Sequence, residues 1–366
     1  MKIKKTIGYF FIFFGILNFI LGFLGILFRD QNLLIKINIS LLLLLIGIWL
    51  TNKNWLSIII PIFIGVGIIA YQYFKFTDAQ IKEIIGYFKN ANYYFVSLAV
   101  FVGFLGNALR SYRWKYMLNH LGYESSFQNN FMAVNIGYLL NLTVPKSGEI
   151  SRALIVKKYN NIPFDKGFGT IVAERIIDMF FLLFFMLLAI LLQFKIVKAF
   201  ILDKIPMQLM FFILLIGIVS FVVFILIYKY SKLKIVTLFK EKISGLKEGL
   251  LSIIHMKEKW TYLFQTVLIW TSYLVTYYFA TKVIPETSSL SLGPILTSFV
   301  VGSIAIAFTN SGFGAYPFLT SKVLLFYAIA EPAGAAFGWI IWTSQMLLVL
   351  LLGLLSFLFL PILNRK

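Results

Sequence analysis

The chain alternates long apolar runs with short polar stretches. Eight runs come near the roughly 20 residues that a helix needs to cross a hydrocarbon core; they occupy residues 7–28, 33–50, 55–74, 93–109, 167–194, 208–228, 262–280 and 337–360. Residues 41–45 and 180–192 are apolar on every face, whereas strands of a transmembrane barrel alternate apolar and polar positions. The pattern predicts an all-α, polytopic membrane protein with about eight spans.

Two further apolar stretches contain breaks that a simple span lacks. Residues 127–144 hold four asparagines and end at Pro145, and residues 291–309 are followed by a glycine-rich break over 310–317. Amide side chains are costly against lipid, so we predict that each stretch is a re-entrant or broken helix. Two such breaks on opposite sides of the membrane are typical of inverted repeats in transporters. We therefore hypothesise an inverted repeat.

Two segments have the composition of helices that lie on a membrane surface. Residues 78–90 repeat apolar positions at helical spacing with charges between them, and residues 231–259 mix aliphatic residues with many lysines. A solvated connector is the alternative for the second segment. We divide the chain into a two-helix N-terminal extension, 1–54, and a main transmembrane domain, 55–366.

The charge of the chain changes the expected partners. The formal net charge is +19, but Lys and Arg fall between the apolar runs rather than on one soluble face, so anionic membrane lipid is a better partner than nucleic acid. Most cations flank one side, which predicts a multi-pass protein of the cell (inner) membrane with both termini in the cytoplasm. With no Cys and two His far apart, we expect no metal and no cofactor.

A first group of candidate residues surrounds the break after residue 144. Lys146 precedes a helix start and Arg152 lies inside it, so with the free amides at Gly148 they could hold a phosphodiester headgroup. Glu149 either acts in function or stabilises the helix start and pairs with Arg152 at i+3. Asn141 and Pro145 complete this predicted break.

A second group lies in an apolar helix, where ionisable residues are expensive unless paired. It consists of Glu174, Arg175 and Asp178, and the expected partners are Arg110, Arg113 and Arg152. This group is either a buried network that only joins helices, or a site for a coupling ion or proton. A third group, Gly312, Gly314 and Tyr316, is either a flexible turn or a gate.

The ordered set of these residues resembles a known family. The set is similar to the flippase-like transmembrane domain of lysyl-phosphatidylglycerol synthases. It consists of Arg110, Arg113, Trp114 and Gly122, then Asn141, Pro145, Gly148, Glu149 and Arg152, then Gly169, Thr170, Glu174, Arg175 and Asp178, and finally Gly312, Gly314, Ala315 and Tyr316. The resemblance covers roughly residues 65–360. It implies a polytopic inner-membrane protein that carries a charged lipid to the outer leaflet, while a separate soluble domain transfers the amino acid. Since the sequence ends at Lys366, we expect a stand-alone member that does not itself make lysyl-lipid.

We therefore expect a lipid translocase rather than an enzyme, for an anionic or modified phospholipid or a polyprenyl-phosphate lipid. Its headgroup-binding residues are predicted to be Arg110, Arg113, Lys146, Gly148 and Arg152, with Glu149, Glu174, Arg175 and Asp178 as a charge-coupling network. Three alternatives stay open: a small-solute transporter, a polytopic lipid-linked glycosyltransferase, and a membrane partner of a separately encoded lipid-modifying enzyme.

Overall fold

The computed structural model describes residues 56–144, 146–194 and 253–365, together with positions 212, 216, 220 and 229. Four sequence predictions therefore lie outside the described residues: the two-helix extension over 1–54, the span over 208–228, most of the amphipathic segment over 231–259, and Pro145. The described part is helical, as predicted, and contains no strand.

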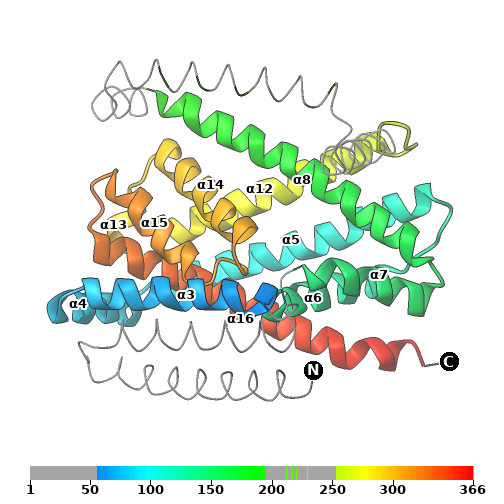
Figure 1. The fold of residues 1–366 in the computed structure, drawn as a ribbon, viewed down its shortest axis with the longest axis horizontal. Helices are drawn as coiled ribbons and strands as arrows, with labels where there is room; N and C mark the ends of the chain where they lie inside the picture. Colours follow the sequence, from blue (N-terminus) through cyan, green and yellow to red (C-terminus); the bar gives the residue numbers. More distant parts are fainter. Residues whose placement is uncertain are drawn as a thin grey trace.

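The helices follow one another with short connections (Figure 1). Their bounds are α3 Leu56–Lys75, α4 Asp78–Asn90, α5 Tyr93–His120, α6 Phe127–Thr143, α7 Ser147–Asn160, α8 Phe164–Leu192, α12 Lys259–Thr281, α13 Pro285–Ser288, α14 Leu292–Phe308, α15 Ala315–Leu325 and α16 Glu331–Leu363.

Three described helices, α5, α8 and α16, are long and apolar enough to cross a membrane. Helices α3 and α4 would add a fourth span if they form one broken crossing, but they are bent by 114° at the break between them. Helix α12, predicted as a span, is not among the three, because its many Thr, Tyr and Trp residues lower its hydropathy. The described part thus contains three or four candidate spans, and the predicted total of eight is not confirmed.

Helix α4 has the bounds predicted for the first interfacial helix. Thr77 caps its start: the Thr77 hydroxyl accepts from the backbone of Gln80, and the Gln80 side chain accepts from the backbone of Thr77. None of its residues is fully buried. At its far end the Tyr87 hydroxyl donates to Glu286 of α13 at 2.8 Å, so α4 is fixed to the end of the bundle where α13 lies.

Helix α5 is longer than predicted. The apolar run predicts a span that ends at residue 109, just before Arg110 and Arg113. That prediction is wrong: the helix continues to His120, and both arginines are buried inside the bundle. They are tolerated there because carboxylates on α8 pair with them.

Helices α6 and α7 form the first predicted re-entrant unit, a tight helical hairpin. The side-chain oxygen of Asn141 accepts from the backbone N–H of Gly148 at 2.7 Å across the break. A β-carbon placed on Gly148 would lie 2.2 Å from the carbonyl oxygen of Gly137. Only glycine at residue 148 lets the two helix backbones come this close.

We expect Gly148→Ala to destabilise the fold by about 3 kcal/mol or more, at the upper end of the range for overpacking, because the atom it meets belongs to the backbone. Gly169→Ala on α8 is the matched control: a β-carbon there meets nothing within 4 Å, and alanine favours a helix by up to about 1 kcal/mol. Thermal unfolding in detergent measures both. Equal unfolding temperatures for the two variants would contradict this close packing.

Helices α14 and α15 form the second predicted re-entrant unit. Gly312 and Gly314 in the break between them have φ angles of 78° and 68°, which glycine adopts at little cost. A β-carbon on Gly314 would lie 2.4 Å from the carbonyl oxygen of Gly65, so this break also packs tightly on α3. Tyr316 is buried against Gly302 of α14.

The two hairpins enter the bundle from opposite ends and meet at their tips (Figure 1). The Asn310 side-chain amide donates to the carbonyl oxygen of Leu142 at 2.9 Å, and the Ser311 hydroxyl lies 3.5 Å from the carbonyl oxygen of Asn141. In chain order, α5, α6–α7 and α8 correspond to α12, α14–α15 and α16. This arrangement agrees with the hypothesis of an inverted repeat.

Candidate functional site

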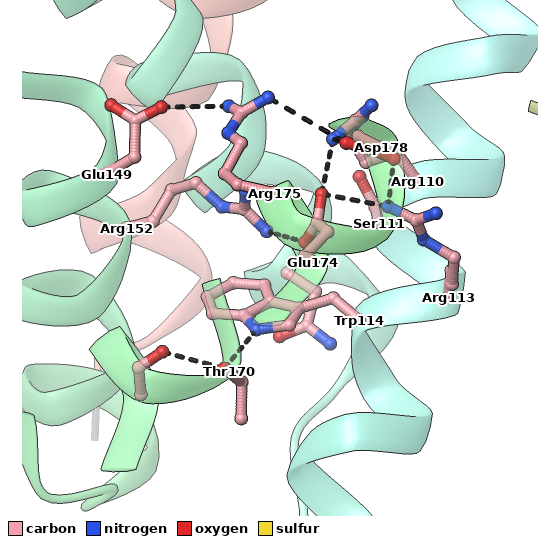
Figure 2. A network of polar contacts seen from close by, with 12 residues as sticks. Arg110, Ser111, Arg113, Trp114, Glu149, Arg152, Thr170, Glu174, Arg175 and Asp178 are labelled. Atoms are coloured by element: carbon pink, nitrogen blue, oxygen red, sulfur yellow. Dashed lines mark hydrogen bonds and ion pairs between the residues drawn. The ribbon is translucent and has the colours of Figure 1, made fainter. Parts of the chain in front are cut away.

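A buried cluster of charged residues joins three helices of the first half (Figure 2). Its carboxylates include Glu174 and Asp178, which stand one turn apart on α8. Arg110 and Arg113 reach them from α5, and Arg152 reaches from α7. The predicted pairing of Arg110, Arg113 and Arg152 with the acids of α8 is confirmed: Glu174 pairs with all three arginines, and Asp178 pairs with Arg110 and Arg113.

Glu174 is the centre of the cluster, with 1% of its side chain exposed. One oxygen accepts from Arg110 and lies 3.2 Å from Arg113, and its other oxygen accepts from Arg152 at 3.0 Å. One carboxylate thus compensates three arginines. Without it these guanidinium groups would be buried next to one another with too little negative charge.

Asp178 extends the same cluster one turn further along α8. It lies 2.8 Å from Arg110 and 3.2 Å from Arg113, and 3.9 Å from Arg175. Helix α8 therefore supplies both acids and one of the arginines. The i to i+4 spacing of the acids places them on one face.

Polar residues of α12 complete the shell around the α5 arginines. The Tyr273 hydroxyl accepts from Nε and Nη2 of Arg110 at 3.2 and 3.1 Å, and Thr266 accepts from Arg113 at 2.9 Å. The ring of Tyr262 lies 5.2 Å from the Arg113 guanidinium carbon. The sequence reading missed these three residues, although their spacing of four and seven places them on one helix face and could have indicated a polar stripe.

The ring of Trp114 packs against the guanidinium group of Arg152. The Arg152 guanidinium lies 4.3 Å from the centre of the Trp114 ring, and the indole N–H donates to the Thr170 hydroxyl at 2.8 Å. Stacking on an aromatic face restricts the guanidinium to one plane. Trp114 and Thr170 thus position Arg152 toward Glu174.

Among the described residues of the cluster, the most exposed are Glu149 of α7 and Arg175 of α8, which pair at 2.9 Å. In this pair 40% of the Arg175 side chain and 22% of the Glu149 side chain are exposed. The predicted i to i+3 pairing of Glu149 with Arg152 is wrong, because Arg152 turns to Glu174 and leaves Glu149 to Arg175. We name these seven residues the arginine–carboxylate cluster: Arg110, Arg113, Arg152, Arg175, Glu149, Glu174 and Asp178.

The remaining predicted residues of the first break lie at the hairpin tip. Lys146 is exposed there, with a left-handed backbone of φ 63°, and it forms no ion pair among the described residues. The Gly148 amide was predicted to be free for an anion, but it donates to Asn141. That prediction is wrong for the arrangement seen here, since the hairpin uses the amide for its own closure.

Another ion-pair group lies in the second half of the molecule. Glu331 at the start of α16 accepts from Lys75 of α3 at 2.6 Å and pairs with Lys322 of α15. Its lysines are about one-third exposed. This group joins three helices near the start of α16. Within the described ranges, no three His, Asp or Glu residues are grouped to hold a metal ion.

Comparisons with known proteins place the chain in a family. Residues 58–362 match the family described as lysylphosphatidylglycerol synthase TM region. A UPF0104 membrane protein of Methanocaldococcus jannaschii is 32% identical over 142 residues, 38% of this chain and 40% of that protein. The glycosyltransferase AglD of Haloferax volcanii is 31% identical over 99 residues, 27% of this chain and 16% of that protein.

The chain thus aligns with less than half the length of either curated relative. No solved structure is significantly similar to it. The family match, however, extends from α3 to α16 and includes the whole arginine–carboxylate cluster and both hairpins. The chain therefore belongs to the lysylphosphatidylglycerol synthase TM region family.

Proposed function

We propose that this protein is a lipid translocase for anionic headgroups. The observation that carries the proposal is the arginine–carboxylate cluster, which is buried in the described part of the bundle and is most exposed at the Glu149–Arg175 pair near the tip of a helical hairpin. A cationic site of this kind offers a lipid phosphate a place inside the bundle while the acyl chains stay in lipid.

The two hairpins supply a way to move such a headgroup. They enter from opposite ends, and their tips touch through Asn310 and Leu142. In transporters built from inverted repeats, rocking of one repeat against the other opens a central site to each side in turn. We assign the tip contact to the closed position of this gate.

The contacts divide the roles among the arginines differently from the sequence prediction. Arg110 and Arg113 are directed to Glu174, Asp178 and the hydroxyls of α12, so we assign them to positioning. Arg175, whose side chain is the most exposed of the four arginines, is assigned to the headgroup. Arg152 also pairs with Glu174, but we assign it to the headgroup as well because two of its nitrogens have no hydrogen-bond partner among the described residues. Since the described acids of the cluster are engaged by arginines, they are poorly suited as a base or metal ligands, which favours translocation over sugar transfer despite the similarity to AglD.

The test is leaflet movement of fluorescent phosphatidylglycerol, phosphatidylcholine and polyprenyl phosphate in liposomes that contain the purified protein. We expect faster movement of an anionic lipid, reduced about ten-fold or more in the double variant Glu149→Gln/Arg175→Gln, since a charge-assisted contact contributes about 1.5–3 kcal/mol. Asp165→Asn/Lys166→Gln, at two exposed positions on the same helix, removes the same charges and should move lipid normally.

The result also separates the alternatives. If folded protein moves no lipid, the proposal fails, and uptake of small solutes or activity with a separate lipid-modifying enzyme becomes the better explanation. Sugar transfer by the purified protein would instead support a glycosyltransferase. Equal loss of movement in both double variants would argue against a specific role for the open end of the cluster.

A further inference from the structure

We infer that Glu149 is an internal competitor of the ligand: its carboxylate occupies, on Arg175, the place that a singly charged phosphodiester headgroup takes. The inference rests on the proposed function and adds to it the chemistry that the site recognises and the residue that controls access. Glu149 and Arg175 come from different helices, α7 and α8, so their contact can break while both helices stay folded.

Exposure restricts a ligand to this pair. The other arginines and acids of the cluster have side chains no more than 11% exposed, whereas Arg175 is 40% exposed. A partly exposed ion pair contributes less than a fully buried one. The Glu149–Arg175 contact is thus the one in the cluster that an incoming anion can replace at low cost.

Unused donors next to this pair fit a larger anion than a carboxylate. Among the described residues, Nε of Arg175 and Nε and Nη1 of Arg152 are buried atoms without a hydrogen-bond partner, and Arg152 is only 2% exposed. Buried donors without partners cost free energy. Arg152 starts one turn after Glu149 on α7 and uses Nη2 for Glu174, so its Nε and Nη1 remain as donors for a phosphate larger than the carboxylate that it replaces. Guanidinium groups match phosphate oxygens in pairs.

The charge of the cluster favours a phosphodiester. Four arginines face three acids in the cluster, so it carries one excess positive charge. When Glu149 leaves, a phosphodiester with one negative charge restores the same balance. A headgroup without net charge leaves two positive charges uncompensated inside the bundle, which is costly. The exchange is therefore neutral only for a singly charged anion.

Asn141 connects this exchange to the gate. Its side-chain amide lies 3.5 Å from the second Glu149 oxygen, its side-chain oxygen holds the Gly148 amide, and its backbone carbonyl faces Ser311 at the tip of the other hairpin. Displacement of Glu149 thus removes a contact from a residue that itself forms the tip contact. Asn141 therefore takes part both in the contact that the ligand displaces and in the contact between the hairpin tips.

The test is equilibrium binding of short-chain phosphatidylglycerol to purified, folded protein in detergent, measured by native mass spectrometry. We expect Glu149→Gln to bind about two- to five-fold tighter, because the competing carboxylate is gone and an exposed ion pair contributes up to about that factor. Arg175→Gln should bind phosphatidylglycerol at least about ten-fold more weakly, because charge-assisted contacts are lost. Glu149→Asp should restore competition.

Glu124→Gln is the matched control, because it makes the same charge change at an exposed position before α6 and should leave binding unchanged. If Glu149→Gln binds no tighter than the unaltered protein, or if Glu124→Gln tightens binding equally, Glu149 is not a competitor. Inorganic phosphate and diacylglycerol are added as competing ligands: displacement by phosphate alone identifies free phosphate as the ligand, and displacement by neither supports the lipid phosphodiester.

Binding and movement are measured separately, so the two proposals can fail separately. Tighter binding by Glu149→Gln without any lipid movement in liposomes would support the role of Glu149 as a competitor and contradict the proposed translocase function. Lipid movement with no tightening in Glu149→Gln would do the reverse.

Discussion

Glu174→Gln should be the most destabilising single substitution in the described part of the cluster. Removing one partner of a buried ion pair costs about 3–5 kcal/mol, and Glu174 serves Arg110, Arg113 and Arg152 at once. A neutral amide keeps the volume but leaves three buried guanidinium groups with only Asp178 close by. We expect a large drop in the unfolding temperature in detergent, followed by intrinsic tryptophan fluorescence.

Glu149→Gln is the control for this measurement, because it removes the same charge from the exposed end of the same cluster. Its pair with Arg175 is partly exposed, so the loss should be about 1 kcal/mol or less. Similar unfolding temperatures for the two variants would mean that burial does not set the strength of these pairs, and the division into a buried centre and an exchangeable end would be wrong.

A buried network of this size is weak evidence for stability alone. Apolar side chains of similar volume would often stabilise a bundle as well or better. The second half shows this alternative, since Trp270, Tyr277, Phe299 and Phe337 form a buried aromatic core there. Both halves have a hairpin and an apolar core, but the ion pairs of the second half are partly exposed, whereas those around Glu174 are buried. This difference supports a functional reason for the charges in the first half.

The sequence predicted the features that depend on local pattern. The bounds of α4 and the two broken helices follow from apolar spacing and from residues such as Gly312 and Asn141, whose effects act within a few positions. Glu174 and Asp178 were found as buried ionisable residues because charges in an apolar helix stand out. The arginines expected to pair with them were cations that the sequence places on the same side of the membrane.

The features that sequence reasoning missed depend on contacts between distant helices. The predicted span ends before Arg110 and Arg113 because arginines normally mark the end of a span. Their pairing with Glu174 and Asp178, more than sixty positions away, explains why α5 continues. Glu149 was paired with Arg152 by helical spacing, but the closer approach of α8 gave it Arg175. Tertiary contacts decided each case.

A covalent link between the two hairpin tips should stop lipid movement. The Asn310 side chain reaches the carbonyl oxygen of Leu142 at 2.9 Å, and the chain has no native cysteine, so the double variant Leu142→Cys/Asn310→Cys introduces the only thiols. Opposite hairpins must separate if the site is to open to each side in turn. A bond between the tips exceeds by far the few kcal/mol that separate such states.

We expect oxidation, or a short bis-maleimide, to reduce movement of the transported lipid about ten-fold or more, since the population of the open state falls with the free energy that holds the tips together. Reduction of the disulfide should restore the rate, and each single-cysteine variant should be unaffected by oxidant. Phosphatidylglycerol binding separates two explanations of a loss. If the linked protein still binds lipid but does not move it, the tips are the gate; if it moves lipid at the full rate with complete cross-linking, the route does not pass between the hairpins.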